Sequence, residues 1–383
     1  MTQRLYDDSM LFKFEARVTS CKAAGKKYEV TLDRSAFFPE GGGQEGDVGT
    51  IGGVKVMDTF ERDGEVIHLC SAPLETDTLV VGEIDEDVRL RRMQNHSGEH
   101  LLMGFIHNKL GYDNVGFHLG KNEVLLDLNG VISQEDIEEC EHKANEAIAR
   151  NVPITISYPD SAELANMTYR SKLEMTENVR IVTIEGIDVC ACCAPHVTST
   201  GGIGIVKVIS SENIKDGTRL HILSGLSAFE LIKQRMDSAA AISQMLSAKP
   251  ERIAEFVEKL LDEKFALKKQ ITDIERKKAA EIIDSMTNES GGSFCVFTDG
   301  LSRDVMREIA NKAVELTDGA AGVFGVEENG YGYIIASRSL PLRSMARDIN
   351  KALGGKGGGS DEMIQGSVAA SREAIEKYFT NIK

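Results

Sequence analysis

Two short stretches, far apart in the sequence, constrain the fold most, because each places two potential metal ligands four residues apart. The first is QNHSGEH at residues 94–100, which contains His96 and His100, and the apolar residues after it repeat at helical spacing. These two imidazoles should therefore lie one turn apart on one helix face, where they can share a metal ion. Cys192 and His196 form the second pair, in a turn-rich segment. If the pairs meet, their soft and borderline donors suit zinc.

The bulk composition is that of a multidomain globular protein. With 383 residues, the chain is too long for one ordinary core, and two to four domains are expected. Hydrophobic residues make up 42% and charged residues 27%, yet no apolar run approaches the ~18 residues of a membrane span. The N-terminus has early acids and no apolar core, so we expect no secretory signal. Three of the seven cysteines crowd into residues 190–193, which favours thiols in a reducing cytoplasm over disulfides.

The first 88 residues read as short strands. Segments of alternating β-forming residues are separated by the turn sequences Ala24-Gly25 and Asp63-Gly64, a pattern typical of a small barrel. Between them stands FPEGGGQ at residues 38–44. Three consecutive glycines cost backbone entropy, and they are often found where a backbone approaches a ligand closely. A flexible connection between strands explains them equally well.

Helices and strands then alternate differently in three later blocks. Residues 89–226 read as α+β, with the histidine helix at 89–111, a helix at 134–150 and strands that form an antiparallel sheet. From 227 to 289, apolar residues step by three or four, which predicts two helices, the second long enough for a coiled coil. Residues 290–383 read as a small α/β domain with helices at 303–316, 341–353 and 361–380. The two helices at 227–289 could pack on their own chain or mediate a homodimer.

The net charge of −16 argues against nonspecific binding to nucleic acid, but a local patch can still bind RNA. One such patch comprises Arg338, Arg343, Arg347, Lys351 and Lys356. Its last member, Lys356, lies in a glycine-rich run at 354–360, which we expect to form a loop before a helix. This run is no Walker A motif, so an NTPase is not expected. A glycine loop at a helix N-terminus could instead hold an RNA phosphate, although a mobile loop is an equal alternative.

Two zinc chemistries fit the ligand pattern. HSGEH matches the H-x-x-E-H signature of inverted metallopeptidases, in which Glu99 would be the general base. That class needs a carboxylate ligand downstream, whereas this chain offers a thiolate and an imidazole. The second chemistry is ester hydrolysis at zinc. Catalytic zinc keeps one position open, and four protein ligands would close it, so the pattern leaves the coordination undecided.

Several motifs occur in the order found in a known family. AFFPEGGGQEGDVG, QNHSGEHLL, IDVCACCAPHVTSTGGIGIVKV, GTRLHILSG and GGKGGGSDEMIQG together resemble the editing half of alanyl-tRNA synthetase and the freestanding AlaX editing proteins of the long type. The resemblance covers nearly the whole chain. It implies an α+β protein with a glycine-rich β-barrel-like domain at 1–88, a zinc-dependent editing domain at 89–226, a helical or coiled-coil spacer at 227–289 and a small α/β, DHHA1-like nucleic-acid-binding domain at 290–383.

The resemblance also implies a function, namely ATP-independent hydrolysis of mischarged Ser-tRNA(Ala), with Gly-tRNA(Ala) as a further candidate. It assigns zinc to His96, His100, Cys192 and His196. His96, His100 and Gln44 would serve catalysis, and substrate would contact the loop and the C-terminal cations, namely Gly41, Gly42, Gly43, Gln44, Arg343, Arg347 and Lys356. Cys190 and Cys193 depart from the family pattern and leave the sulfur ligand open. A noncatalytic tRNA-binding protein with structural zinc is the main alternative, and a homodimer through the spacer or the C-terminal domain is a possible assembly.

Overall fold

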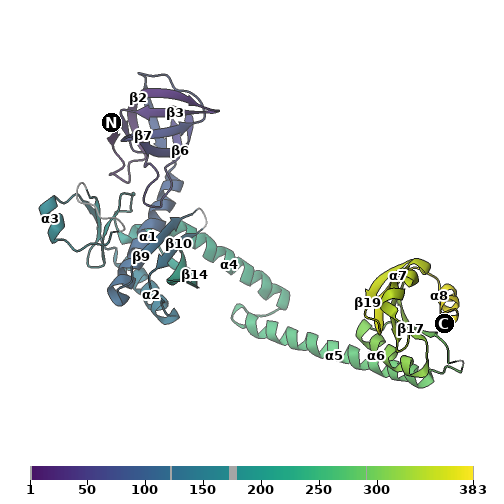
Figure 1. Cartoon of the computed structure of the whole chain (residues 1–383). Coiled ribbons are helices and arrows are strands. Elements are labelled where there is room, and N and C mark those ends of the chain that lie inside the picture. Colours follow the sequence, from purple (N-terminus) through teal and green to yellow (C-terminus); the bar gives the residue numbers. More distant parts are fainter. Residues whose placement is uncertain (1, 121–122, 172–178, 290, 383) are drawn as a thin grey trace. The chain divides into compact units, whose positions relative to one another are not determined.

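The structure is a computed structural model that describes residues 2–120, 123–171, 179–289 and 291–382 (Figure 1). The chain forms two compact units, Met1–Ala239 and Ala240–Lys383, which are considered separately. Among the described residues, no helix has the length and apolar character needed to cross a membrane.

The first unit begins with a closed six-stranded barrel, as the strand pattern predicted. Its strands follow the order β2-β3-β7-β6-β5-β8, and the first half of β2 alternates buried and exposed side chains, as the inward and outward faces of a barrel require. Both expected turns are present, at Gly25 and at Asp63-Gly64, where the backbone takes positive φ values. The barrel strands are β2 (Lys13–Ala24), β3 (Lys27–Leu32), β5 (Gly49–Ile51), β6 (Val54–Arg62), β7 (Glu65–Cys70) and β8 (Leu79–Ile84), and β1 (Gln3–Arg4) pairs with β4 (Arg34–Ser35) beside them.

The histidine helix α1 (Glu86–Leu110) follows the barrel and is the centre of the α+β region. Its N-cap is Asp85, whose side chain accepts a hydrogen bond from the Val88 amide, so the helix begins three residues before the predicted start. Gly111 ends it in the left-handed conformation with φ of 70°, as predicted. A four-stranded antiparallel sheet of order β14-β15-β10-β9 and a three-stranded sheet of order β11-β12-β13 accompany the helix. Their strands are β9 (Asn114–Leu119), β10 (Val124–Leu128), β11 (Ile154–Ser157), β12 (Ile181–Ile184), β13 (Asp188–Ala191), β14 (Val206–Ile214) and β15 (Gly217–Ser224).

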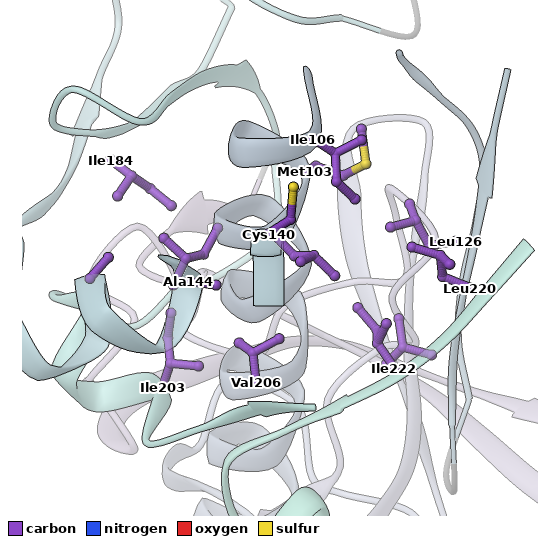
Figure 2. Close-up of a cluster of buried hydrophobic side chains, with 14 of the residues drawn as sticks. Met103, Ile106, Leu126, Cys140, Ala144, Ile184, Ile203, Val206, Leu220 and Ile222 are labelled. Carbon is purple, nitrogen blue, oxygen red and sulfur yellow. The ribbon is translucent and has the colours of Figure 1, made fainter. Parts of the chain in front are cut away.

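The apolar core of this region packs α1 against α2 (Gln134–Arg150) and the larger sheet (Figure 2). Met103 and Ile106 of α1, Cys140 of α2, and Leu126 and Ile222 of the sheet are all fully buried. Removing this much apolar surface from water stabilises the fold and fixes the face of α1 that carries the histidines.

Two short helical elements complete this region. Residues Thr200–Ile203 form a 3-10 turn, after which β14 begins at Val206. The second is α3 (Ser161–Asn166), which the sequence did not predict. Residues 121–122, which fall between β9 and β10, lie outside the described residues.

A buried ion pair joins the barrel to α1. The guanidinium of Arg89 contacts the Asp47 carboxylate, and both side chains are almost fully excluded from solvent. Arg89 also donates to the carbonyl oxygens of Ala36, at 2.7 Å, and Ser9, at 3.2 Å. The same Asp47 carboxylate accepts the Phe38 amide at 2.6 Å. The segment after Phe38, which carries the three glycines, is therefore anchored to the histidine helix at both of its ends.

The helical spacer consists of α4 (Gly225–Leu246) and α5 (Ile253–Ser285), separated near Pro250 as predicted. Seven large apolar residues of the described α5 lie exposed, and five of them are spaced by three, four or seven residues, namely Val257, Leu260, Leu267, Ile271 and Ile274. A coiled-coil seam has this spacing, so homodimerisation through the spacer stays a prediction.

The C-terminal part of the second unit is a five-stranded sheet of order β16-β17-β18-β20-β19 with three helices. Its elements are β16 (Phe294–Thr298), α6 (Arg303–Ala313), β17 (Ala320–Glu327), β18 (Gly330–Ser337), α7 (Leu342–Ala352), β19 (Gly355–Gly359), β20 (Met363–Val368) and α8 (Arg372–Thr380). The helix predicted at 361–380 is wrong in its first half, which forms β20. Ser290, the first residue of the expected linker, lies outside the described residues.

The glycine-rich run at 354–360 is a second correction, because it forms the edge strand β19 and not a loop before a helix. The reason is steric. A Cβ atom at Gly357 would lie 2.3 Å from the Tyr333 hydroxyl and 2.3 Å from the Gln365 carbonyl oxygen, so only glycine lets β19 approach β20 this closely.

Replacing Asp47 with Asn should destabilise the protein by about 3–5 kcal/mol, because it leaves the Arg89 charge buried without a counter-ion. Urea unfolding followed by circular dichroism measures this change. Glu61→Gln is the matched control, since its ion pair with Arg4 is exposed on the same barrel. An unfolding midpoint for Asp47→Asn that equals that of the control would show that the ion pair contributes nothing.

Candidate metal centre

The two ligand pairs meet in the first unit. His96 and His100 come from consecutive turns of α1, and Cys192 and His196 come from the segment after β13. One potential ligand atom from each of the four residues lies within 4.8 Å of the others. The ring centres of His96 and His100 lie 4.7 and 4.6 Å from that of His196. The convergence expected from the sequence is therefore present, and the cluster could hold a metal ion.

The imidazoles are oriented as metal-binding histidines usually are. Each Nδ1 atom has a hydrogen-bond partner outside the cluster: Gln44 Oε1 at 2.9 Å for His96, Asp188 Oδ2 at 3.2 Å for His100, and Ser97 Oγ at 3.0 Å for His196. The Nε2 atoms face inward instead, and those of His96 and His196 lie 3.6 and 3.3 Å from Cys192 Sγ. Outer partners of this kind fix the ring and its tautomer, which leaves Nε2 free to bind. The donor set therefore fits a metal ion.

Charges around the cluster favour a thiolate at its centre. Burial alone would raise the pKa of Cys192, but the neighbouring His96 and His196 hold it well below its usual value. Burial also lowers the pKa of His196 to about 3, so this imidazole is neutral, as a ligand must be. Asp188 is buried too, yet its hydrogen bonds to His100 and Arg170 lower its pKa to about 2.

Asp188 is held in place by a second residue. Arg170 donates two hydrogen bonds to its carboxylate, at 2.7 Å to Oδ1 and 2.8 Å to Oδ2. The pKa of His100 is raised well above its usual value, because Cys190, Asp188 and Cys192 together outweigh the effect of burial.

The three neighbouring cysteines occupy different positions. Cys192 belongs to the four-residue cluster, whereas Cys190 lies in a second group with His100 and Asp188. Cys193 is exposed and lies beside the glycine loop, where its sulfur is 3.5 Å from the place of a Cβ atom at Gly42. This arrangement favours Cys192 as the sulfur ligand, a choice that the sequence left open.

The glycine loop forms a tight turn beside the cluster. The amide and carbonyl groups of Gly41 and Gln44 bond to each other, each at 3.0 Å. Gly43 has a φ of 83°, and a Cβ atom there would lie 2.7 Å from the ring of Phe117, which itself stacks on His96. The loop, Phe117 and His96 therefore pack in direct succession, so the loop is an ordered wall of the site.

In the side-chain amide of Gln44, the oxygen has a hydrogen-bond partner and the nitrogen has none among the described residues. Its Oε1 atom contacts His96, while Nε2 is buried and has no hydrogen-bond partner among the described residues. An unpaired buried donor costs about 1–3 kcal/mol. An acceptor on a bound molecule would remove this cost.

Sequence reasoning missed several neighbours of the cluster. Asp188 and Ser97 were not selected, although each stands within four residues of a predicted ligand. Arg170 gives no local signal, because it reaches Asp188 from a separate segment. Glu99, which the sequence offered only as the base of the H-x-x-E-H signature, lies inside α1 and is only 3% exposed.

The predicted C-terminal cations lie in the second unit. Arg343, Arg347 and Lys351 are exposed on α7, at intervals of four residues, and Lys356 is exposed on β19. Asn350 ties the two elements together, since it donates to the Gly357 carbonyl at 3.0 Å. Among the described residues none of these four cations forms an ion pair, whereas Arg338 pairs with Glu315 at 3.6 Å.

Comparison with known proteins matches both units. Residues 179–220, which include Cys192 and His196, match the threonyl and alanyl tRNA synthetase second additional domain, and residues 291–382 match the DHHA1 domain. The Archaeoglobus fulgidus alanine–tRNA ligase is 31% identical over 96% of this chain, which spans 42% of the ligase. The alanyl-tRNA editing protein AlaX-L of Pyrococcus horikoshii is 26% identical over 98% of this chain and 96% of its own length. The C-Ala domain of Aquifex aeolicus alanyl-tRNA synthetase matches 25% of the chain with 20% identity and a TM-score of 0.22.

These findings define a class first: proteins that join a synthetase-type editing region to a DHHA1 domain. Within it, the chain is a homologue of the editing protein AlaX-L and is similar to part of the alanine–tRNA ligases. The chain spans less than half the length of the ligases it matches. The resemblance drawn from the sequence motifs is thereby confirmed.

Substitution of the three cysteines should separate their roles. Cys192→Ser should lose bound metal after dialysis, whereas Cys190→Ser and Cys193→Ser should keep it, because only Cys192 shares the cluster with all three histidines. Metal content measured by mass spectrometry against protein concentration gives the result. Retention of a full equivalent by Cys192→Ser, with loss in Cys190→Ser, would reassign the sulfur ligand.

Proposed function

We propose that the chain is a zinc-dependent aminoacyl-tRNA deacylase that hydrolyses Ser-tRNA(Ala), with Gly-tRNA(Ala) as a second substrate. The observation that supports this most is the convergence of His96, His100, Cys192 and His196 beside the ordered glycine loop, in a homologue of AlaX-L. Thiolate and imidazole donors in this number suit zinc best among common divalent ions.

Editing of this kind is needed for a physical reason. An alanine pocket cannot exclude the smaller glycine, and it rejects an added hydroxyl only weakly, since discrimination of this kind is worth about 1–3 kcal/mol. A second site can use the serine hydroxyl, because alanine leaves the partner of that hydroxyl unpaired.

Four residues of the site would hold the metal ion, and Gln44 would bind the substrate. His96, His100, Cys192 and His196 would hold the ion, which supplies Lewis-acid activation of water or of the ester carbonyl. Gln44 keeps His96 in the binding tautomer through Oε1 and offers Nε2 as a donor to the substrate. A carbonyl oxygen that gains negative charge during attack by water would accept this donor most strongly.

The glycine loop would receive the 3′ end of the tRNA. Gly41, Gly42 and Gly43 expose backbone next to Phe117 and Cys193. A substrate can come closer to this backbone than to any residue with a side chain, which fits a site for the terminal adenosine and its amino acid.

The C-terminal cations would contact the tRNA backbone. Arg343 and Arg347 lie one turn apart on α7, and Lys356 lies on the adjacent β19. Phosphate contacts from such exposed cations position a nucleic acid without reading its sequence. The glycine-rich strand β19 takes the place of the phosphate loop that the sequence suggested.

A noncatalytic tRNA-binding protein with a structural zinc is the second candidate. One observation favours it: four protein ligands close a tetrahedral site, and closed sites are usually structural. The metallopeptidase alternative has less support, because the four-residue cluster includes no carboxylate, which that class requires.

Purified protein should hydrolyse Ser-tRNA(Ala) at least tenfold faster than Ala-tRNA(Ala), and His100→Ala should lose this activity together with its metal. Release of radiolabelled amino acid from each charged tRNA measures both rates. His142→Ala is the control, because that histidine is exposed on α2. Intact Ser-tRNA(Ala) after prolonged incubation with metal-loaded protein that binds tRNA would favour the structural-zinc candidate.

Neutralising Arg343, Arg347 and Lys356 together with Gln should weaken tRNA binding and reduce its salt dependence by about three ions, one for each phosphate contact. Filter binding over a range of salt concentrations measures both quantities. The control triple of Arg303, Lys312 and Arg372, also changed to Gln, alters the net charge equally, but each of these residues is paired with a carboxylate. Equal effects of the two triples would remove the assignment of a specific surface.

A further inference from the structure

Glu99 is a buried carboxylate whose presence the metal cluster alone does not explain. It stands on α1 between the two histidines in sequence, and it is 3% exposed. Residues three apart share a helix face, so Glu99 lies next to His96. Its Oε2 atom also lies 3.9 Å from Nε2 of the adjacent His100. Burying a carboxylate is costly unless its oxygens are paired.

Only one oxygen of this carboxylate is well satisfied. Asn114 of β9 donates to Oε1 at 2.5 Å. The nearest cationic or imidazole group to Oε2 is His100 Nε2, at 3.9 Å, which is too long for a hydrogen bond. Among the described residues, Oε2 has no hydrogen-bond donor.

The free oxygen lies near the ligand nitrogen of His100, 3.9 Å from Nε2. His100 uses Nδ1 for Asp188, so Nε2 is the nitrogen turned toward the other ligands. Glu99 Oε2 therefore lies beside the ligand edge of His100. It is nevertheless no member of the four-residue group whose ligand atoms lie within 4.8 Å of one another. It is placed next to the ion site without completing it.

Asp188, the other acid near His100, already has hydrogen-bond partners for both of its carboxylate oxygens. Both oxygens of Asp188 accept hydrogen bonds from Arg170, and one also contacts His100. Of the two carboxylates next to His100, Glu99 is therefore the one with an oxygen that can accept a proton.

We propose that Glu99 is the general base of the deacylation, with Asn114 as the residue that positions it. This inference rests on the proposed function. Glu99 Oε2 takes a proton from water as the water oxygen bonds to the ester carbonyl carbon. The bond between that carbon and the ribose oxygen then breaks, and Glu99 returns the proton to the ribose oxygen. The products are the free amino acid and a tRNA with its terminal hydroxyl restored, and Glu99 has given up the proton that it took.

The first test compares two conservative variants of α1. Glu99→Gln keeps an oxygen for Asn114 but cannot accept the proton, so kcat for Ser-tRNA(Ala) should fall about 100-fold or more, while KM stays within about threefold. Metal content and thermal unfolding should equal those of the wild type. Glu86→Gln, an exposed carboxylate on the first turn of the same helix, should leave kcat unchanged.

The second test restores the missing group. Glu99→Ala should be inactive in chloride buffer and regain at least tenfold of its activity in formate, because a small carboxylate can enter the space left by the side chain. His100→Ala should not respond to formate. Since a purely structural role would not produce this difference, rescue supports a base.

Three outcomes would overturn the inference while wild-type hydrolysis remains. The first is a Glu99→Gln protein with wild-type kcat. The second is a raised KM at unchanged kcat, which would mean that Glu99 binds the substrate ammonium. The third is loss of metal from Glu99→Gln, which would make it a support for the ligands. If the wild type itself does not hydrolyse Ser-tRNA(Ala), the proposed function fails, and this inference fails with it.

Discussion

The ion pair between Arg89 and Asp47 is the interaction on which the site depends. It is fully buried, and it joins the barrel to the helix that carries His96 and His100. Such a pair costs desolvation, and its net contribution to stability can be small. Its value lies in geometry: Asp47 also holds the Phe38 amide, so the loop between them, with Gln44 at its end, is fixed against α1. The hydrogen bond from Gln44 to His96 therefore joins two substructures that come from different parts of the chain.

Around the cluster, each imidazole has a different kind of support. Gln44 comes from the barrel loop, Ser97 from α1 itself, and Asp188 from β13, where Arg170 holds it. Because the three supports come from separate elements, the ligand geometry depends on the folding of the whole first unit. The proposed base, Glu99, is held by a fourth element, β9. The arrangement suits a preorganised site, in which little movement is needed when substrate and ion are present.

The sequence predicted the histidine helix and the barrel well, because their signals are local. Helical spacing places His96 and His100 on one face, and turn residues such as Gly25 and Gly111 mark where elements end. Contacts between distant segments leave no such local mark. Arg170 binds Asp188, which lies 18 positions later in the chain. The hydrogen bond from Asn114 to the buried Glu99 also joins separate elements, so the sequence does not show it. The glycine run at 354–360 misled for a related reason, since glycines mark close approach of backbone without saying whether the neighbour is a ligand or, as here, a strand.

The bond between His96 Nδ1 and Gln44 Oε1 also couples metal occupancy to the polarity of the substrate pocket. An imidazole that gives Nε2 to an ion must carry its proton on Nδ1, so the Gln44 amide has to present oxygen to the ring and its NH₂ group to the pocket. When the ion leaves, the proton can move to Nε2, and the amide can then turn over so that its oxygen faces the pocket. Apoprotein and metalloprotein would thus offer opposite hydrogen-bonding groups to the same ligand.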